Sequence, residues 1–315
     1  MTSAFTESNL LFVNCFRHRR FDKDGALLVL FKAFTDPWDI GGVEVALGDV
    51  NGDLWPDIIA GEGPAHFART TVASGDFRDG VRVGAGDKNG DGRDEVYMCT
   101  GPSTVYTHYE IFEYNPTAPN LRGLIMNEGL GWVTGKNTYN GCRVAGGDLD
   151  GDGKDELLAL FEGPSNALLI RNQYGGKHVR WNALGGGYTG QISIAAADVN
   201  GDKRAEVFLG RLTGLDKVPP VFMYDGAKVM ASSVLPTPAI TYPITNSIYN
   251  TGIYVAAHDL SLDGISRADG EAVDDGWVLD VRRAEGADVH VAVDEHLRAA
   301  GHAAERWPDR LIGPG

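Results

Sequence analysis

The sequence has few cysteines, a shortage of basic residues and no long apolar run. Its three cysteines, Cys15, Cys99 and Cys142, are too few and too scattered to indicate a disulfide framework or a zinc site. We interpret them as small buried hydrophobic residues. Lysine and arginine number 28 against 43 acids, which gives a net charge of −15. Nucleic acids and anionic membranes are therefore poor partners, because both bind clustered positive charge.

Two further absences concern the membrane and export. No run of about 18 apolar residues is present, so the sequence predicts no transmembrane helix and no membrane insertion. Residues 1–7 lack the basic and apolar regions of a secretory signal peptide. From this start we expect either a cytoplasmic protein or a mature exported form with an added methionine.

Glycine and acidic residues are abundant, and both recur in one repeated segment. Glycine accounts for 42 of 315 residues, roughly twice its usual share. An Asp/Asn/Gly-rich segment appears four times in full and once in damaged form, each copy opening with an aspartate. The opening aspartates are Asp49, Asp87, Asp148, Asp198 and Asp259. Their spacings of 38, 61, 50 and 61 residues are close to the size of a propeller blade.

Each copy reads as a strand, an acidic loop and a second strand. A short apolar strand such as 43–47 ends in small residues, which predicts close packing there. Second strands follow at 58–60, 96–98, 157–160 and 207–209, and further strands at 109–114 and 221–224 give about four per unit. Four-stranded sheets repeated radially form a β-propeller, whereas a β-sandwich does not explain the recurring loop. The sequence therefore predicts an all-β propeller with five countable units and five to seven blades.

The two ends of the sequence fit a closed ring. Residues 9–34 contain two expected strands with a turn at 21–25, and strands are also expected near 253–257, 277–281 and 289–293. We expect the terminal strands to share one blade, which removes an exposed sheet edge. Residues 1–293 then form a single propeller, and residues 294–315 form a short tail that is helical or frayed.

The acidic loops carry a pattern of metal ligands. Counting from the opening aspartate, positions 1, 3, 5 and 9 hold side-chain oxygens in all four complete copies. Such oxygens suit Ca²⁺, which takes about six to eight of them, and the carbonyl of position 7 adds another. Glycine at position 4 permits the bend that brings positions 1 and 5 together. The ligands predicted for about four Ca²⁺ sites are Asp49, Asn51, Asp53, Trp55 and Asp57; Asp87, Asn89, Asp91, Arg93 and Glu95; Asp148, Asp150, Asp152, Lys154 and Glu156; and Asp198, Asn200, Asp202, Arg204 and Glu206.

Other readings of the loops are less favoured. The loops hold no histidine or cysteine, which disfavours zinc and copper. An EF-hand requires a glutamate at position 12 and flanking helices, but position 12 is Ala60, Met98, Ala159 or Leu209. Plain hairpin turns remain an alternative for any one copy, but they do not explain an acid at position 9 in all four. The fifth copy loses positions 3, 4 and 9, so we predict that it binds no metal.

The loops and their flanking strands resemble FG-GAP/VCBS repeats, the calcium-loop blades of integrin-α-like β-propellers. The similarity spans roughly residues 10–275 and is specific at the four loops. The resemblance implies a propeller with Ca²⁺ on loops inside its blades, located outside the cell or on its surface and serving adhesion or ligand binding. Integrin-like propellers have seven blades, so the five countable units here depart from the family.

The sequence favours a non-catalytic binding scaffold. It contains none of the hydrolase, zinc-protease or phosphate-loop motifs. Exposed aromatic residues on loops, with Trp55, Trp132, Trp181 and Tyr188 as candidates, would contact a glycan or protein ligand on a propeller face, unless they fill gaps between blades. The alternatives are a carbohydrate-active enzyme of the lyase or dehydratase type and a calcium-dependent lectin. We expect a monomer, whose net charge of −15 falls to −7 when four Ca²⁺ are bound.

Overall fold

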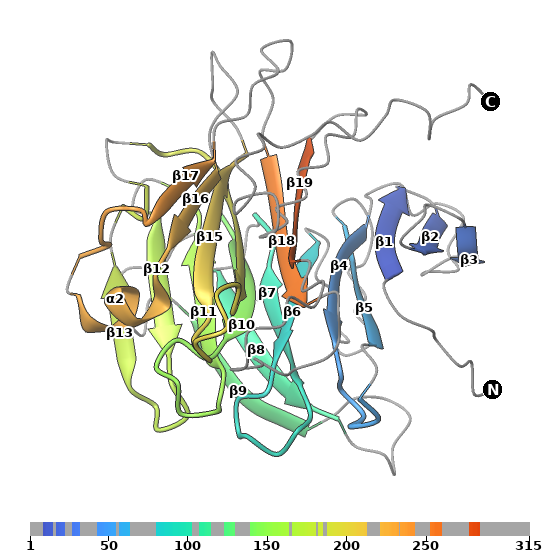
Figure 1. Ribbon diagram of the computed structural model, residues 1–315, viewed down its shortest axis with the longest axis horizontal. Coiled ribbons are helices and arrows are strands. Elements are labelled where there is room, and N and C mark those ends of the chain that lie inside the picture. The colour runs from blue at the N-terminus through green and yellow to red at the C-terminus, as the bar shows by residue number, and fades with distance from the viewer. Residues whose placement is uncertain are drawn as a thin grey trace, which may run out of the picture.

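The computed structural model describes residues 9–14, 17–22, 27–31, 43–54, 57–63, 80–102, 107–114, 123–129, 139–163, 166–180, 182–184, 188–212, 221–232, 234–242, 253–259 and 277–283. These residues form antiparallel strands and one six-residue helix (Figure 1). The strands are β1 (Asn9–Asn14), β2 (Arg17–Asp22), β3 (Leu27–Phe31), β4 (Val43–Gly48), β5 (Asp57–Glu62), β6 (Val81–Gly86), β7 (Glu95–Thr100), β8 (His108–Glu113), β9 (Gly123–Gly129), β10 (Cys142–Gly147), β11 (Glu156–Phe161), β12 (Ala167–Arg171), β13 (Lys177–Arg180), β14 (Ile192–Ala197), β15 (Glu206–Arg211), β16 (Val221–Tyr224), β17 (Ile240–Tyr242), β18 (Ile253–Asp259) and β19 (Trp277–Arg283), and the helix is α2 (Gly226–Ala231).

The strands are grouped into six sheets in chain order. Three sheets have four strands each, ordered β6-β7-β8-β9, β10-β11-β12-β13 and β14-β15-β16-β17. The sheets β4-β5 and β18-β19 have two strands, and β1-β2-β3 has three. The all-β prediction is confirmed, and four strands per unit are found in three of the described sheets.

Some local expectations need correction. Three strands, not two, occupy the N-terminal segment, because Arg17–Asp22 is a strand of its own. The terminal strands lie in two separate sheets, so the described residues do not show the predicted shared blade. A short helix follows β16, and Asp225 caps it by accepting a hydrogen bond from the Lys228 N–H at 3.0 Å. The strand expected at 289–293 and the tail at 294–315 lie outside the described residues.

Among the described residues, the hydrophobic core is divided into four clusters that lie between successive sheets. One apolar cluster lies between the β6 and β10 sheets and includes Tyr97, Tyr109 and Leu157, and another lies between the β10 and β14 sheets. Strands β7 and β11 are buried at every residue, because sheets cover both of their faces. Among the described residues no helix is long and apolar enough to span a membrane.

The first strands of neighbouring sheets approach one another closely. Strands β4, β6, β10, β14 and β18 contact one another in chain order. A Cβ on Gly84 would lie 2.8 Å from the carbonyl oxygen of Val144, and one on Gly86 would lie 3.0 Å from the Cα of Gly146. Only glycine leaves room for this approach. The small residues at the strand ends therefore do mark close packing, as the sequence predicted.

A disulfide links two neighbouring sheets. Cys99 in β7 and Cys142 in β10 are bonded, with their Cα atoms 5.7 Å apart and 43 residues between them in sequence. This corrects the interpretation of these cysteines as unbonded hydrophobic residues. Both are fully buried, as expected, but they lie on facing strands of adjacent sheets. Cys15 lies outside the described residues.

Ion pairs link the same sheets through their first strands. Arg82 in β6 and Arg143 in β10 both contact Glu44 in β4, at 3.9 and 3.4 Å. Both arginines also contact the buried Glu162, at 3.3 and 3.1 Å. We call these four residues the ion-pair cluster. It places two acids and two bases between three successive sheets, so each buried charge has an opposite partner.

Candidate metal centre

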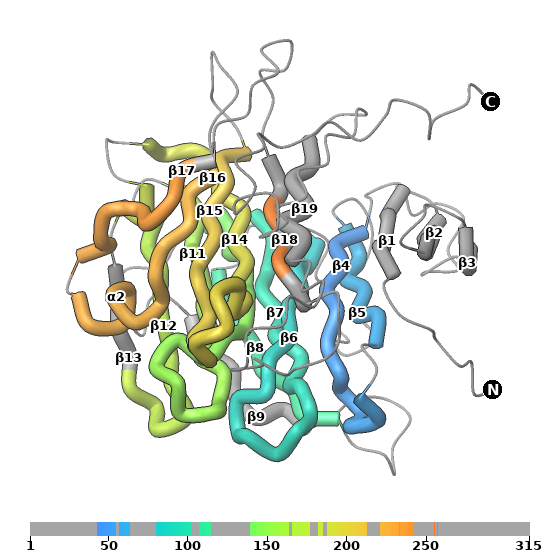
Figure 2. The backbone as a smooth tube through the Cα atoms, viewed as in Figure 1, coloured from blue at the N-terminus to red at the C-terminus, as the bar shows by residue number. Residues whose placement is uncertain are grey.

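The four complete acidic loops connect the first and second strands of consecutive sheets. Loop 1 is residues 49–57, loop 2 is 87–95, loop 3 is 148–156 and loop 4 is 198–206. Position 1 follows the first strand, and position 9 begins the second strand. Figure 2 shows loops 1 to 3 as bends low in the molecule and loop 4, in yellow, somewhat higher, each at the lower end of its pair of strands. The repeated sequence therefore forms a row of similar loops.

The carboxylate at position 1 organises each loop. In loop 2, Asp87 Oδ1 accepts hydrogen bonds from the N–H groups of Gly90 (2.7 Å) and Asp91 (3.1 Å), and Oδ2 accepts one from Gly92 (2.8 Å). Loops 1 and 3 repeat all three bonds, and loop 4 keeps those from Gly201 and Lys203. The position-1 side chain therefore satisfies the backbone donors of the bend that follows it.

The bend requires positive φ at two positions, not one. Position 4 is glycine with φ of 77° to 79° in every loop, as the sequence predicted. Position 6 also has positive φ, at Leu54 (69°), Gly92 (82°), Gly153 (81°) and Lys203 (67°). The sequence pattern does not reveal this second requirement, because only two of the four copies have glycine there.

The side chains at positions 3 and 9 meet inside each loop. In loop 2, Glu95 Oε2 accepts from the Lys88 N–H at 2.7 Å, and Oε1 accepts from Asn89 Nδ2 at 2.6 Å. Corresponding amide-to-carboxylate bonds join Asn200 to Glu206 (2.6 Å) and Asn51 to Asp57 (3.0 Å). Where position 3 is asparagine, its amide therefore partly satisfies the acid at position 9.

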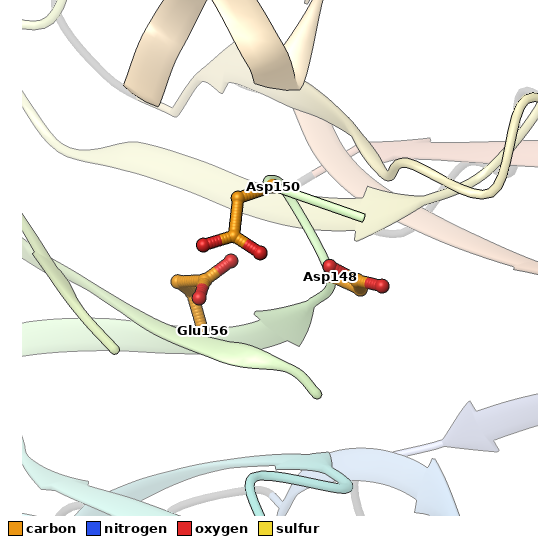
Figure 3. A group of neighbouring side chains, drawn as sticks. All are labelled: Asp148, Asp150 and Glu156. Carbon is orange, nitrogen blue, oxygen red and sulfur yellow. The ribbon is translucent and has the colours of Figure 1, made fainter. Parts of the chain in front are cut away.

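Loop 3 differs, because its position 3 is an acid. One carboxylate oxygen from each of Asp148, Asp150 and Glu156 lies within 4.8 Å of the others. Figure 3 shows Asp150 and Glu156 pointing toward each other, with Asp148 beside them. Carboxylates this close repel unless a cation lies between them. Among the described residues, this is the group that best fits a hard divalent ion.

Burial raises the pKa of the acids that line the loops. Burial, with neighbouring acids adding to it, raises the pKa of Glu95, Glu156 and Glu206 to about 7. Burial raises the pKa of Asp57 and Asp150 as well, and neighbouring aspartates add to both effects. A bound divalent cation would lower these pKa values, because it stabilises the ionised form of every carboxylate ligand. The donor set therefore fits Ca²⁺ both in the type of atom and in charge.

The basic residues at position 7 contact the preceding loop. A Cβ on Gly52 of loop 1 would lie 2.8 Å from Cγ of Arg93, and one on Gly90 would lie 3.0 Å from Cγ of Lys154. Arg204 lies in the same way against Gly151. Each of these side chains thus covers the bend of its neighbour. Trp55, the fourth residue at this position, lies outside the described residues.

The acids at position 8 also bind the preceding loop, and they are not among the predicted site residues. Asp94 accepts a hydrogen bond from the Asp49 N–H, and Asp155 accepts one from the Asp87 N–H. The signal available in the sequence was the glycine before the opening aspartate, at Gly48 and Gly86. A Cβ on either would lie 2.7 Å from the Oδ2 of the incoming aspartate.

Of the other aromatic residues predicted to contact a ligand, Tyr188 is among the described residues. Tyr188 is half-buried, its hydroxyl donates to the Gln191 carbonyl at 2.7 Å, and the Arg211 guanidinium carbon lies 4.8 Å from its ring centroid. It therefore packs between structural elements, which agrees with the gap-filling alternative. Trp132, Trp181 and the fifth loop after Asp259 lie outside the described residues, so the prediction that the fifth loop binds no metal is untested.

Comparison with known proteins identifies the repeat. Residues 148–209 match the FG-GAP-like repeat family, a stretch that runs from the first residue of loop 3 through loop 4 into β15. No curated protein matches the chain. The match falls on the segment where the acidic pattern and the antiparallel hairpins coincide. Residues 148–209 are thus similar to an FG-GAP-like repeat, which supports the resemblance to FG-GAP/VCBS repeat proteins.

Proposed function

We propose that the chain is a calcium-binding β-propeller in which about four Ca²⁺ ions rigidify the loops within the blades. The observation that carries this proposal is the convergence of Asp148, Asp150 and Glu156 in loop 3, with oxygens within 4.8 Å of one another. The ligands would be the side chains at positions 1, 3, 5 and 9 of each loop, with the carbonyl of position 7. The ion would supply positive charge to a partly buried group of acids.

The arrangement of the sheets supports a propeller of five to seven blades. Successive sheets bury apolar clusters between them, and their first strands neighbour one another in chain order. Propellers have this arrangement of sheets around a common axis. The faces of such a structure would serve a non-catalytic scaffold for ligand binding or adhesion, with a protein or glycan as the ligand.

The disulfide supports a location outside the cell or on its surface. Disulfides persist in oxidising compartments and are rare in the reducing cytosol. The bond between Cys99 and Cys142 joins two sheets that are each rich in buried contacts. FG-GAP repeats of surface proteins fit this setting, and millimolar extracellular calcium keeps even weak loops occupied.

Calcium titration tests the proposed function directly. We expect calorimetry of the chelator-treated protein to show about four sites, and calcium to raise the melting temperature. Each site adds about 2.7 kcal/mol to the free energy of unfolding at a 100-fold excess of ion over Kd. Asp152→Ala, which deletes the position-5 ligand of loop 3, should remove one site. An unchanged melting temperature in chelator and in calcium would contradict the proposal.

The ligand is tested separately from the ion. We expect the calcium-loaded protein to bind a defined member of a glycan array or a protein partner, and the chelated protein to bind it more weakly. A carbohydrate-active enzyme would instead release product from a polysaccharide, which reducing-end and unsaturated-sugar assays would detect. Turnover in those assays would support the enzyme alternative and contradict the non-catalytic scaffold.

A further inference from the structure

Backbone hydrogen bonds join each acidic loop to the loop that precedes it in the chain. The N–H of Asp94, at position 8 of loop 2, donates to the carbonyl of Asp49 at 2.8 Å, and Asp94 Oδ2 accepts from the Asp49 N–H at 2.8 Å. Asp155 in loop 3 repeats both bonds with Asp87, at 2.8 and 3.1 Å. The residue bound is in each case position 1 of the preceding loop.

Loop 4 provides a natural comparison, because its position 8 is Ala205. The Ala205 N–H still donates to the Asp148 carbonyl at 2.7 Å, but an alanine has no carboxylate to accept the Asp148 N–H. A Cβ on Gly147 would lie 2.8 Å from the Cβ of Ala205. The backbone hydrogen bond therefore accompanies the packing of the sheets whatever residue is at position 8. The side-chain hydrogen bond is formed only where position 8 is an aspartate, at Asp94 and Asp155.

The bound residue is the one on which the rest of the loop depends. The carboxylates of Asp49 and Asp87 each accept three N–H groups from positions 4 to 6 of their own loops. Fixing the backbone of position 1 thus fixes the carboxylate around which the ligands are arranged. The position-7 stems of Arg93 and Lys154 add a second contact to the same preceding loops.

We propose that Asp94 and Asp155 are positioning residues for the Ca²⁺ sites of loops 1 and 2, and that the loops bind calcium as a coupled row. This inference rests on the proposed calcium function. An ion in loop 3 orders Glu156, which directly follows Asp155, and Asp155 in turn holds Asp87 of loop 2. Coupling between sites is reciprocal, so an ion in loop 2 strengthens binding in loop 3 to the same degree.

Paired substitutions at Asp155 separate its hydrogen bond from its acidic group. Asp155→Ala removes both, whereas Asp155→Asn removes the acidic group but keeps an oxygen that accepts the Asp87 N–H. Partners that orient metal ligands typically change affinity by about 10- to 100-fold when mutated. By calcium calorimetry we therefore expect Asp155→Ala to weaken one site about tenfold more than Asp155→Asn does. Equal weakening by both variants would overturn the positioning role.

Site-deleted backgrounds identify which loop responds. In the Asp152→Ala background, which lacks the loop 3 site, the difference between the alanine and asparagine variants should persist. In the Asp91→Ala background, which lacks the loop 2 site, it should vanish. Asp152→Ala alone should also weaken binding at a neighbouring site if the row is coupled. A difference that vanishes with the loop 3 site, or neighbours that keep full affinity, would overturn the proposal.

A readout without calcium separates this inference from the proposed function. Hydrogen exchange in chelator reports whether the Asp87 N–H is bonded. We expect Asp155→Ala to speed exchange of that amide about tenfold or more and Asp155→Asn to leave it slow. If the wild-type chain binds no calcium but this contrast holds, the proposed function fails and the positioning role stands. If calcium binds but the contrast is absent, only the positioning role fails. Asp94→Ala and Asp94→Asn, read at Asp49, repeat the test if Asp155→Ala does not fold.

Discussion

Position 6 of the acidic loops has positive φ in all four copies, but only loops 2 and 3 have glycine there. Leu54 in loop 1 and Lys203 in loop 4 adopt φ of 69° and 67° with full side chains. A side chain in this region costs roughly 1–2 kcal/mol, because Cβ crowds the following carbonyl. The strain persists because the position-1 carboxylate binds the N–H of this residue, at 2.7 Å in both loops.

Relief of this strain is measurable at Lys203, whose side chain is exposed. We expect Lys203→Gly to raise the free energy of unfolding by about 0.5–1 kcal/mol, because relieved strain outweighs the added entropy of the unfolded chain. Gly92→Ala is the matched control, since a Cβ there meets nothing within 4 Å. It should lower stability by about 1 kcal/mol. Urea denaturation in chelator measures both, and destabilisation by Lys203→Gly would contradict the strain argument.

At the scale of strands and sheets, the sequence predicted what lies within a repeat but not what joins repeats. The loops were predictable because Asp87 through Glu95 carry their pattern in nine consecutive residues. The contacts between sheets involve partners far apart in the sequence, 43 residues for Cys99 with Cys142 and 99 for Arg143 with Glu44. Their pairing depends on how adjacent sheets are aligned, which no local pattern encodes.

The ion-pair cluster illustrates the energetic consequence of such contacts. Glu162 is 2% exposed and contacts both Arg82 and Arg143. We expect Glu162→Ala to lower the free energy of unfolding by about 3–5 kcal/mol, because it leaves buried positive charge undercompensated. Lys228→Ala, which breaks the exposed pair with Asp225, should change it by less than about 1 kcal/mol. Equal effects of the two variants in urea denaturation would refute a stabilising role for the cluster.

The disulfide predicts a specific count of free thiols. The chain has three cysteines, and the bond between Cys99 and Cys142 leaves Cys15. We expect thiol titration of the denatured, unreduced protein to give one reactive group, and titration after reduction to give three. Reduction should also lower the free energy of unfolding by about 2–4 kcal/mol. Three thiols before reduction in protein purified under oxidising conditions would contradict the linkage.

For the whole molecule, many of the acids behind the net charge of −15 lie in the four acidic loops. The proposed ligands include thirteen carboxylates, three each in loops 1, 2 and 4 and four in loop 3. The acids at position 8 of loops 2 and 3 lie beside these carboxylates. Burial raises the pKa of Asp94 to about 6 and of Asp155 to about 8. Without a cation, folding therefore brings together acids that water and distance separate in the unfolded chain. Protons and calcium each relieve this repulsion, and they compete for the same carboxylates.

The metal-free protein should become less stable as the pH rises through neutrality. The pKa of Glu95, Glu156 and Glu206 rises from the ordinary 4.5 to about 7 on folding. Between these values the folded chain holds more protons than the unfolded chain, so the free energy of unfolding falls as the pH increases. In chelator we expect a higher melting temperature at about pH 5.5 than at about pH 8.

Calcium should reverse this order, because the ion binds ionised carboxylates and competes with protons. With excess calcium we expect the melting temperature to be higher at about pH 8 than at about pH 5.5. Glu206→Gln, which removes one titrating group from loop 4, should reduce the pH dependence in chelator and also remove one calcium site. A chelated protein whose melting temperature rises with pH, or a calcium effect that is the same at both pH values, would show that these loops are not linked acid clusters that exchange protons for an ion.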